Sequence, residues 1–107
     1  MAKHTVNVKI SERKKIEYDK HCVHVCGGDT ITWKLDKVRP FAIVVKAVNS
    51  PLDWGSAVLF KRNKTIVGRV REDAKPGYYP YALCAVDGGE LLLDDPEIIV
   101  RRPDGRG

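Results

Sequence analysis

Residues 77–100 read GYYPYALCAVDGGELLLDDPEIIV, and this stretch decides the fold. After the Pro76-Gly77 turn signal, its aromatic first half predicts a strand over residues 78–84. Its Ile- and Val-rich end predicts a final strand over residues 97–101. Residues 86–90, which lie between the two strands, have the composition of a turn and are predicted to form a loop.

The sequence upstream of this stretch alternates between apolar and polar residues with the period of two that is typical of strands. In residues 4–10, for example, Val6, Val8 and Ile10 fall on one face. Residues 36–40 and 49–60 lack the alternation and are predicted to be loops, the second with room for one helical turn. The remaining predicted strands cover residues 4–10, 21–26, 30–35, 41–48 and 65–71, with a short strand or ordered edge at 16–18 and a short apolar segment at 91–93.

The pattern predicts an all-β fold, because no segment shows a long period of 3.6 residues. Residues 41–48 are apolar almost throughout and would also suit a short buried helix, but the β-branched Ile43, Val44 and Val45 favour a strand. Seven to eight short strands separated by turns indicate a sandwich or barrel. With 107 residues, we expect one domain over residues 1–101 and a flexible tail at 102–107.

Composition narrows the classes of function. No run approaches the roughly 20 apolar residues of a membrane helix, and the start of the chain lacks the apolar core of a signal peptide. We therefore expect a cytoplasmic protein without a membrane partner. The formal net charge of +5 and the basic residues Arg69, Arg71 and 61–64 leave weak binding of a polyanion as one hypothesis. Nucleic acid is not favoured, because the aromatic residues do not interleave with the basic clusters.

The three cysteines suggest a second hypothesis. Their odd number fits a reducing compartment better than a disulfide framework. Cys22, His24 and Cys26 share one face of the strand 21–26, but Cys22 and Cys26 would lie about 13 Å apart. Two neighbours on this face could bind one metal ion, with a further ligand from His21, His4 or Cys84. His24, Cys26 and Cys84 are thus weak metal candidates, and the alternative is a strand face that a partner chain covers.

Three segments together resemble the cupredoxins, the small Greek-key β-sandwiches. GDTITW at 28–33, PGYYPYALC at 76–84 and EIIV at 97–100 occur in the order and spacing of that family. The resemblance implies a Greek-key sandwich. The copper proteins of the family hold a copper ion with two His, one Cys and usually a Met, so the resemblance also implies positions for these ligands in this chain. Thiolate and imidazole are the ligands that such a site requires. Here Phe41 falls at the position of the first His, and Asp87 and Glu90 fall at those of the ligands that follow Cys84.

The register of the aromatic strand raises a further question about Cys84. Tyr79 and Tyr81 share a face with Leu83 and not with Cys84. Either a bulge near Pro80 turns Cys84 inward, or Leu83 fills the place of the ligand with carbon. Neither arrangement supplies a His, so we predict no type-1 copper site and no cofactor. The set Cys84, Asp87 and Glu90 mixes soft and hard ligands, and a polar loop beside a half-buried thiol explains it better than a metal site does.

The sequence therefore predicts a non-catalytic binding module with an unidentified protein partner. It contains no nucleophile-elbow, P-loop or other catalytic motif, so we do not expect an enzyme. Pro40, Phe41 and Trp54 are expected to form an apolar contact surface at one end of the sandwich. The alternatives are a metal-binding or redox protein that uses Cys22, His24, Cys26 or Cys84, and the weak polyanion binder.

Overall fold

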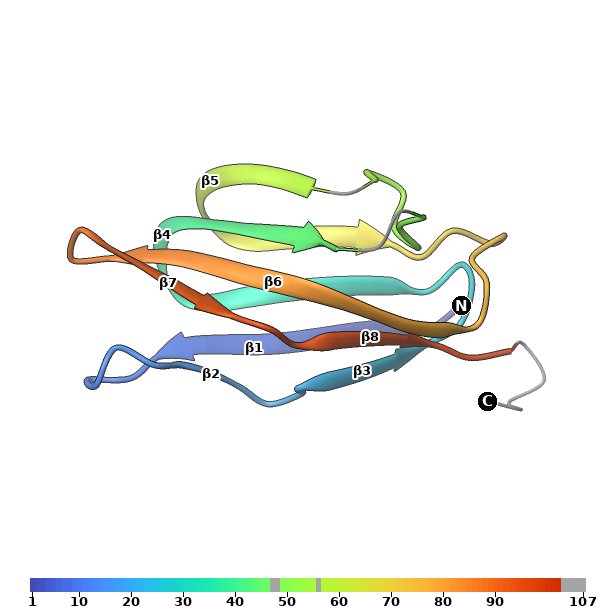
Figure 1. Ribbon diagram of the computed structural model, residues 1–107, viewed down its shortest axis with the longest axis horizontal. Helices are drawn as coiled ribbons and strands as arrows, with labels where there is room; N and C mark the ends of the chain where they lie inside the picture. Colours follow the sequence, from blue (N-terminus) through green and yellow to red (C-terminus); the bar gives the residue numbers. More distant parts are fainter. Residues whose placement is uncertain (47–48, 56, 103–107) are drawn as a thin grey trace.

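The computed structural model describes residues 1–46, 49–55 and 57–102, with residues 57–63 described by their backbone alone. Strands make up its regular structure, and none of the described residues is helical (Figure 1). The strands are β1 (Lys3–Ile10), β2 (Ile16–Tyr18), β3 (Cys22–Val25), β4 (Thr30–Val45), β5 (Ala57–Arg69), β6 (Gly77–Asp87), β7 (Glu90–Asp94) and β8 (Glu97–Val100). The prediction of an all-β chain with seven to eight strands is confirmed.

Two long strands fold the sheet into two facing layers (Figure 1). The strand order is β2-β1-β4-β6-β8-β3, with β5 paired to β4 and β7 paired to β6. The first half of β4 pairs in parallel with β1, and its second half pairs with β6. The first half of β6 pairs with β8, and its second half pairs with β4 and β7. Because each long strand takes part in two layers, the curled sheet closes on itself as a β-sandwich.

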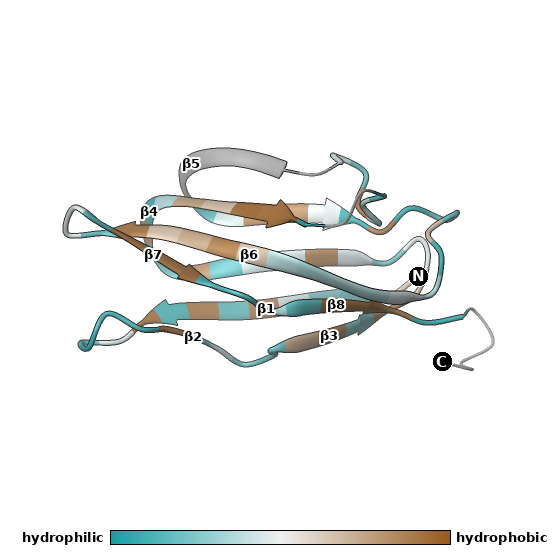
Figure 2. Ribbon diagram, viewed as in Figure 1, coloured by the Kyte–Doolittle hydropathy of each residue, from teal (hydrophilic) through white to brown (hydrophobic). Residues whose placement is uncertain are grey.

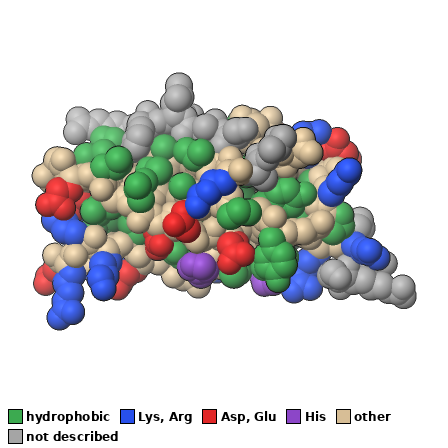
Figure 3. Space-filling view, viewed as in Figure 1, with side chains coloured by type: hydrophobic (Ala, Val, Ile, Leu, Met, Phe, Trp, Pro, Cys, Tyr) green, Lys and Arg blue, Asp and Glu red, His purple; other side chains and the backbone are tan. Residues whose placement is uncertain are grey.

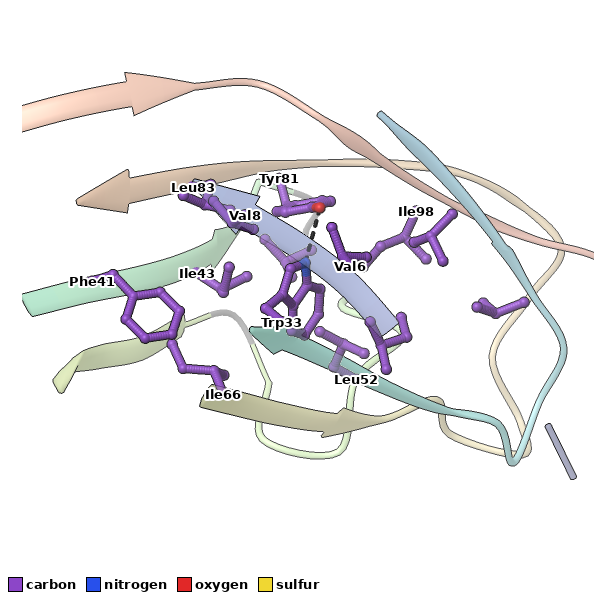
Figure 4. Packing of buried hydrophobic residues seen from close by; sticks show 14 of the residues in the cluster. Val6, Val8, Trp33, Phe41, Ile43, Leu52, Ile66, Tyr81, Leu83 and Ile98 are labelled. Atoms are coloured by element: carbon purple, nitrogen blue, oxygen red, sulfur yellow. Dashed lines mark hydrogen bonds between the residues drawn. The ribbon is translucent and has the colours of Figure 1, made fainter. Parts of the chain in front are cut away.

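Large side chains from both layers fill the space between them (Figure 4). Trp33 of β4, Tyr81 of β6 and Phe41 of β4 are the largest fully buried side chains. The indole Nε1 of Trp33 donates a hydrogen bond of 2.9 Å to the Tyr81 hydroxyl, and the two rings meet edge to face with centroids 5.6 Å apart. The bond matters because a buried indole or phenol without a partner would destabilise the fold.

The prediction of a loop at residues 36–40 is wrong, since β4 runs through it. After a register shift, the pairing with β5 resumes at Arg39 opposite Asn63 and at Pro40 opposite Arg62. The strand bends at this shift, as strands do at bulges. Arg39 is buried there, and its guanidinium reaches Asp36 at 3.4 Å and Asp87 at 3.2 Å. These ion pairs explain how a charged segment is accommodated inside a strand.

Two further loop predictions need correction. In the segment 49–60, the described residues 49–55 are irregular, and β5 begins at Ala57. No helical turn occurs in the described part of it. Residues 86–90 are a tight hairpin and not a loop, since β6 continues to Asp87 and β7 begins opposite it at Glu90. Gly88 and Gly89 connect the strands with φ of 58° and 83°, angles that glycine adopts without strain.

Several sequence predictions reach beyond the described residues. The strand predicted over 41–48 ends at Val45, and residues 47 and 48 lie outside the description. The predicted flexible tail lies outside it from residue 103 onward. In the described part of the chain, no helix is long and apolar enough to cross a membrane.

Candidate metal centre

The register of β6 decides which side chain takes the interior position near Cys84. The ladder runs without a bulge, pairing Tyr79 with Ile98, Tyr81 with Val45 and Leu83 with Ile43. Tyr81 and Leu83 are fully buried between the layers. Cys84 therefore points to the opposite face of β6, where burial and the nearby Asp95 raise the pKa of its thiol. Of the two arrangements that the sequence leaves open, the structure has Leu83 on the interior face.

The other positions that the cupredoxin resemblance assigns to copper ligands also lack a convergent donor set. Phe41 is fully buried and pairs across the strands with Ala85. Asp87 and Glu90 face each other at the tip of the β6–β7 hairpin. The hydrogen bond of 2.7 Å from Lys14, followed by the charges of Lys14 and then Arg39, lowers the pKa of Asp87. The described residues Cys84, Asp87 and Glu90 do not come together as one ligand group.

A different group of donors gathers where β3 meets β8. These strands pair in parallel, with Cys22 opposite Glu97 and Val23 opposite Ile98. Val23 and Ile98 are buried in the core, so Cys22 and Glu97 share the outward face of the pair. The Glu97 amide donates a hydrogen bond of 2.9 Å to the carbonyl of His21, which fixes the backbone just before β3.

Side chains from both strands converge at this place. A nitrogen of His21, the sulfur of Cys22 and a carboxylate oxygen of Glu97 all lie within 4.8 Å of one another. The Cys22 sulfur is 3.8 Å from His21 Nδ1 and 3.8 Å from Glu97 Oε1. Within the described ranges, no other three His, Cys, Asp or Glu residues are gathered so closely. We refer to His21, Cys22 and Glu97 as the rim cluster.

Neighbouring groups shape the rim cluster. Burial, and then the charge of Glu97, raise the pKa of the Cys22 thiol. The imidazole of His21 stacks on the ring of Tyr18, with centroids 5.6 Å apart and an interplanar angle of 25°. Tyr18 is held in turn, because its hydroxyl donates a hydrogen bond of 2.7 Å to Asp94. In the view of Figure 3, histidine side chains lie beside acidic ones along the lower edge of the molecule.

Of Cys22, His24, Cys26 and Cys84, only Cys22 belongs to the rim cluster. His24 Nδ1 accepts a hydrogen bond of 3.0 Å from Arg101 Nε. The Cys26 thiol points toward the Arg102 carbonyl at 3.8 Å. Cys84 lies on β6, away from this strand pair. Sequence reasoning included His21 only as a supplementary ligand and missed Glu97, because the pairing of β3 with β8 leaves no local signal in either segment.

The basic residues considered for a polyanion have acidic neighbours. The Arg71 guanidinium forms hydrogen bonds of 3.0 and 2.8 Å with Asp73, which lowers the pKa of that carboxyl group. Arg69 lies 3.4 Å from Glu72. The side chains of residues 61–63 are outside the description. Binding of a polyanion therefore stays a prediction, and the acidic neighbours of Arg69 and Arg71 do not favour it.

Comparison with solved structures places the sandwich among known folds. A pseudoazurin from Hyphomicrobium denitrificans superposes with a TM-score of 0.58, at 19% identity over 95% of this chain and 77% of that chain. A methionine-to-glutamine mutant of amicyanin in the Cu(I) form gives a TM-score of 0.55, at 18% identity over 91% and 82% of the two chains. No family model and no curated protein matches the sequence. The similarity shows that the chain has a cupredoxin-like β-sandwich fold.

Proposed function

We propose that this protein is a non-catalytic binding module that uses the cupredoxin-like sandwich as a scaffold, without type-1 copper, and docks a protein partner on the outward face of β4, β6 and β7. The observation that carries the proposal is that both faces of this sheet are apolar. An antiparallel sheet in a sandwich normally presents its second face to water, with polar side chains there.

Cross-strand pairing defines the residues of this face. Cys84 lies between Ala42 and Leu93, and Val86 pairs with Leu91. Val44 and Ala82 form the next row. We call these seven residues the outer face: Ala42, Val44, Ala82, Cys84, Val86, Leu91 and Leu93.

The outer face exposes large apolar side chains next to one another. Leu91 is 58% exposed, Leu93 64% and Val44 36%. Figures 2 and 3 show hydrophobic residues gathered over this part of β6 and β7. The ion pair between Lys46 and Asp95 lies beside it. Adjacent exposed apolar residues with charged neighbours are typical of protein-binding surfaces.

The expected contact surface of Pro40, Phe41 and Trp54 is not formed. Phe41 is fully buried and offers nothing to a partner. Trp54 packs against Trp33, with ring centroids 6.4 Å apart, and its Nε1 donates a hydrogen bond of 2.9 Å to the Val67 carbonyl. The outer face therefore replaces that end of the sandwich as the proposed docking surface.

Site-specific photo-crosslinking in cells of the source organism tests the docking surface. A photoreactive residue at Leu93 should give a discrete adduct with a partner. The matched control is Tyr78, which is 71% exposed and lies on the part of β6 that pairs with β8. Leu91→Lys in the same chain should abolish the adduct at position 93. The same adducts at positions 93 and 78, or none at position 93, would contradict the proposal.

The absence of type-1 copper is tested separately with a variant that carries Cys22→Ser and Cys26→Ser, which leaves Cys84 as the single thiol. We expect no intense visible thiolate–copper band when Cu²⁺ is added, because Leu83 and Phe41 fill the interior positions with carbon. An intense band in this variant would refute the copper-free assignment.

A further inference from the structure

The rim cluster offers one nitrogen, one sulfur and one oxygen ligand. Zinc takes imidazole, thiolate and carboxylate ligands alike, usually in tetrahedral sites. Calcium and magnesium require oxygen ligands, so the Cys22 sulfur makes them poor occupants. The ligand types therefore favour a borderline-soft divalent cation.

The spacing of the donors also suits zinc. With Zn–S of about 2.3 Å and Zn–N or Zn–O of about 2.0 Å, sulfur and its neighbouring ligand atoms lie about 3.5 Å apart in a tetrahedral site. The Cys22 sulfur is 3.8 Å from His21 Nδ1 and 3.8 Å from Glu97 Oε1. Small rotations of the side chains would bring the three ligand atoms to the distances that a zinc ion requires.

The backbone and the second layer of contacts hold the donors in place before any ion binds. Cys22 and Glu97 are fixed opposite each other by the β3–β8 ladder. The His21 ring rests on Tyr18, and Tyr18 is tied to Asp94. Such supporting contacts orient ligands and reduce the entropy that a metal must overcome.

Charge at the rim cluster provides a further argument for a cation. If the Cys22 thiol lost its proton to a metal ion, its sulfur and the Glu97 carboxylate, 3.8 Å apart, would both be negative, and a divalent ion would neutralise them. His21 is exposed, and a tetrahedral ion held by three protein ligands would leave a fourth position for water or for a ligand atom from another molecule. Three protein ligands with one open position are typical of zinc centres that are not purely structural.

We propose that His21, Cys22 and Glu97 form a zinc-binding site at the outer rim of the sandwich, with an open fourth position. The site is separate from the outer face, which lies on β4, β6 and β7. It is also separate from the interior positions of Phe41 and Leu83. A failure of the docking proposal would therefore leave the zinc proposal unaffected, and the reverse also holds.

The test uses the full chain, without an affinity tag, after treatment with a chelator and a reductant. Zinc affinity is measured by competition with a chromophoric chelator, and Co²⁺ serves as a spectroscopic probe of the thiolate ligand. The wild type should bind one equivalent of zinc and show a thiolate-to-cobalt band. Cys22→Ser should lose the band. Each of the variants Cys22→Ser, His21→Ala and Glu97→Gln should weaken zinc binding by about 100-fold, which is at least as much as metal sites lose when a residue that supports a ligand is removed.

Matched variants exist on the same strand. Cys26→Ser removes a thiol four positions along the chain from Cys22, and His24→Gln removes the neighbouring imidazole. Both should bind zinc with wild-type affinity. The proposal is overturned if the wild type fails to compete for zinc, if Cys22→Ser binds as the wild type does, or if Cys26→Ser or His24→Gln abolishes binding. Circular dichroism checks that every variant is folded. If Glu97→Gln does not fold, the zinc affinity of Cys22→Ser decides the proposal.

Discussion

The interior end of the sandwich and the rim cluster differ in what their side chains offer to a ligand. At the interior end, Phe41 and Leu83 are fully buried and present only carbon. At the rim, His21, Cys22 and Glu97 bring three different donor atoms within 4.8 Å of one another. The first region is built for packing and the second for polar contacts, although both belong to the same eight-stranded sheet.

The difference shows how one fold can keep its frame while the chemistry changes place. A buried strand position contributes to stability through the volume it fills, so carbon there is favourable. Donor atoms remain accessible only on the outward face of a strand, as Cys22 and Glu97 are. A likeness to copper-containing structures therefore fixes the scaffold of this chain and not its ligand chemistry.

Phe41→Ala should have the largest effect on stability. Truncation of a buried phenylalanine removes apolar contacts and leaves a cavity, at a cost of about 3–5 kcal/mol. We expect this loss in the free energy of unfolding, measured by urea titration. A loss below about 1 kcal/mol would show that the interior end is not packed with carbon as described, and would break the comparison.

Tyr81→Phe should have the next largest effect. It leaves the buried Trp33 Nε1 without its acceptor, which should cost about 1–3 kcal/mol at neutral pH. Urea titration of the variant and the wild type measures the difference. Tyr78→Phe is the matched control and should stay within about 0.5 kcal/mol of the wild type.

Tyr81→Phe should also change how the free energy of unfolding depends on pH in alkaline solution. Burial is the largest cause that raises the pKa of Tyr81 above the ordinary value for tyrosine. The neutral hydroxyl is therefore favoured in the folded state, and its contribution is fully present below the unfolded pKa of about 10. As the pH rises above that value, the unfolded state loses its proton first and stability declines. Tyr81→Phe should decline less steeply above about pH 10, and an identical slope would contradict this assignment.

Tyr18→Phe should have a smaller effect than Tyr81→Phe, because Tyr18 is only partly buried. Loss of the hydrogen bond to Asp94 should cost about 0.5–1.5 kcal/mol. The ring that supports His21 is kept, so zinc binding should weaken less than in any of the ligand variants. Urea titration and the chelator competition measure the two effects on one sample. A loss of zinc affinity as large as that of Cys22→Ser would contradict the minor supporting role of the Tyr18 hydroxyl.

Cys22→Ser should have the smallest effect on the metal-free protein. Its side chain is half-buried, and its thiol makes long contacts of 3.8 Å with His21 and Glu97, so the free energy of unfolding should stay within about 0.5 kcal/mol of the wild type. In zinc at 100 times the dissociation constant, the wild type alone should gain about 2.7 kcal/mol. An equal gain in the variant would remove the distinction between the two regions.

Much of the fold could be predicted from local pattern. The alternation around Val6 and Val8 marks β1, and that around Ile31, Trp33 and Leu35 marks the first half of β4. Where prediction failed, tertiary pairing overrode composition. Asp36 and Arg39 suggest a loop, but the ion pairs of the buried Arg39 and a partner strand keep them within β4. Gly88 and Gly89 suggest a longer loop than the two-residue turn that they form.

The candidate site was less predictable than the fold. Period-two alternation places Leu83 and not Cys84 on the same side as Tyr81, but only the ladder excludes a bulge between them. Cys22 stood out as a cysteine in the sequence. Glu97 did not, because a lone carboxylate at the start of a strand is common and its partner strand lies far away in the chain. The parallel pairing of β3 with β8 depends on the order of all the strands in the sheet, so neither segment predicts it alone.

The pairing of β3 with β8 also has a consequence for the order of folding. Cys22 and Glu97 are 75 positions apart, so the β3–β8 ladder that brings them together closes a long loop of the chain. Contacts between distant segments form only after the entropy of closing the chain has been overcome, and they slow folding. The rim cluster is thus assembled only when the last strand has joined the third. Co²⁺ present during refolding would report the rate of this step, because its thiolate band would appear only once β8 has paired with β3.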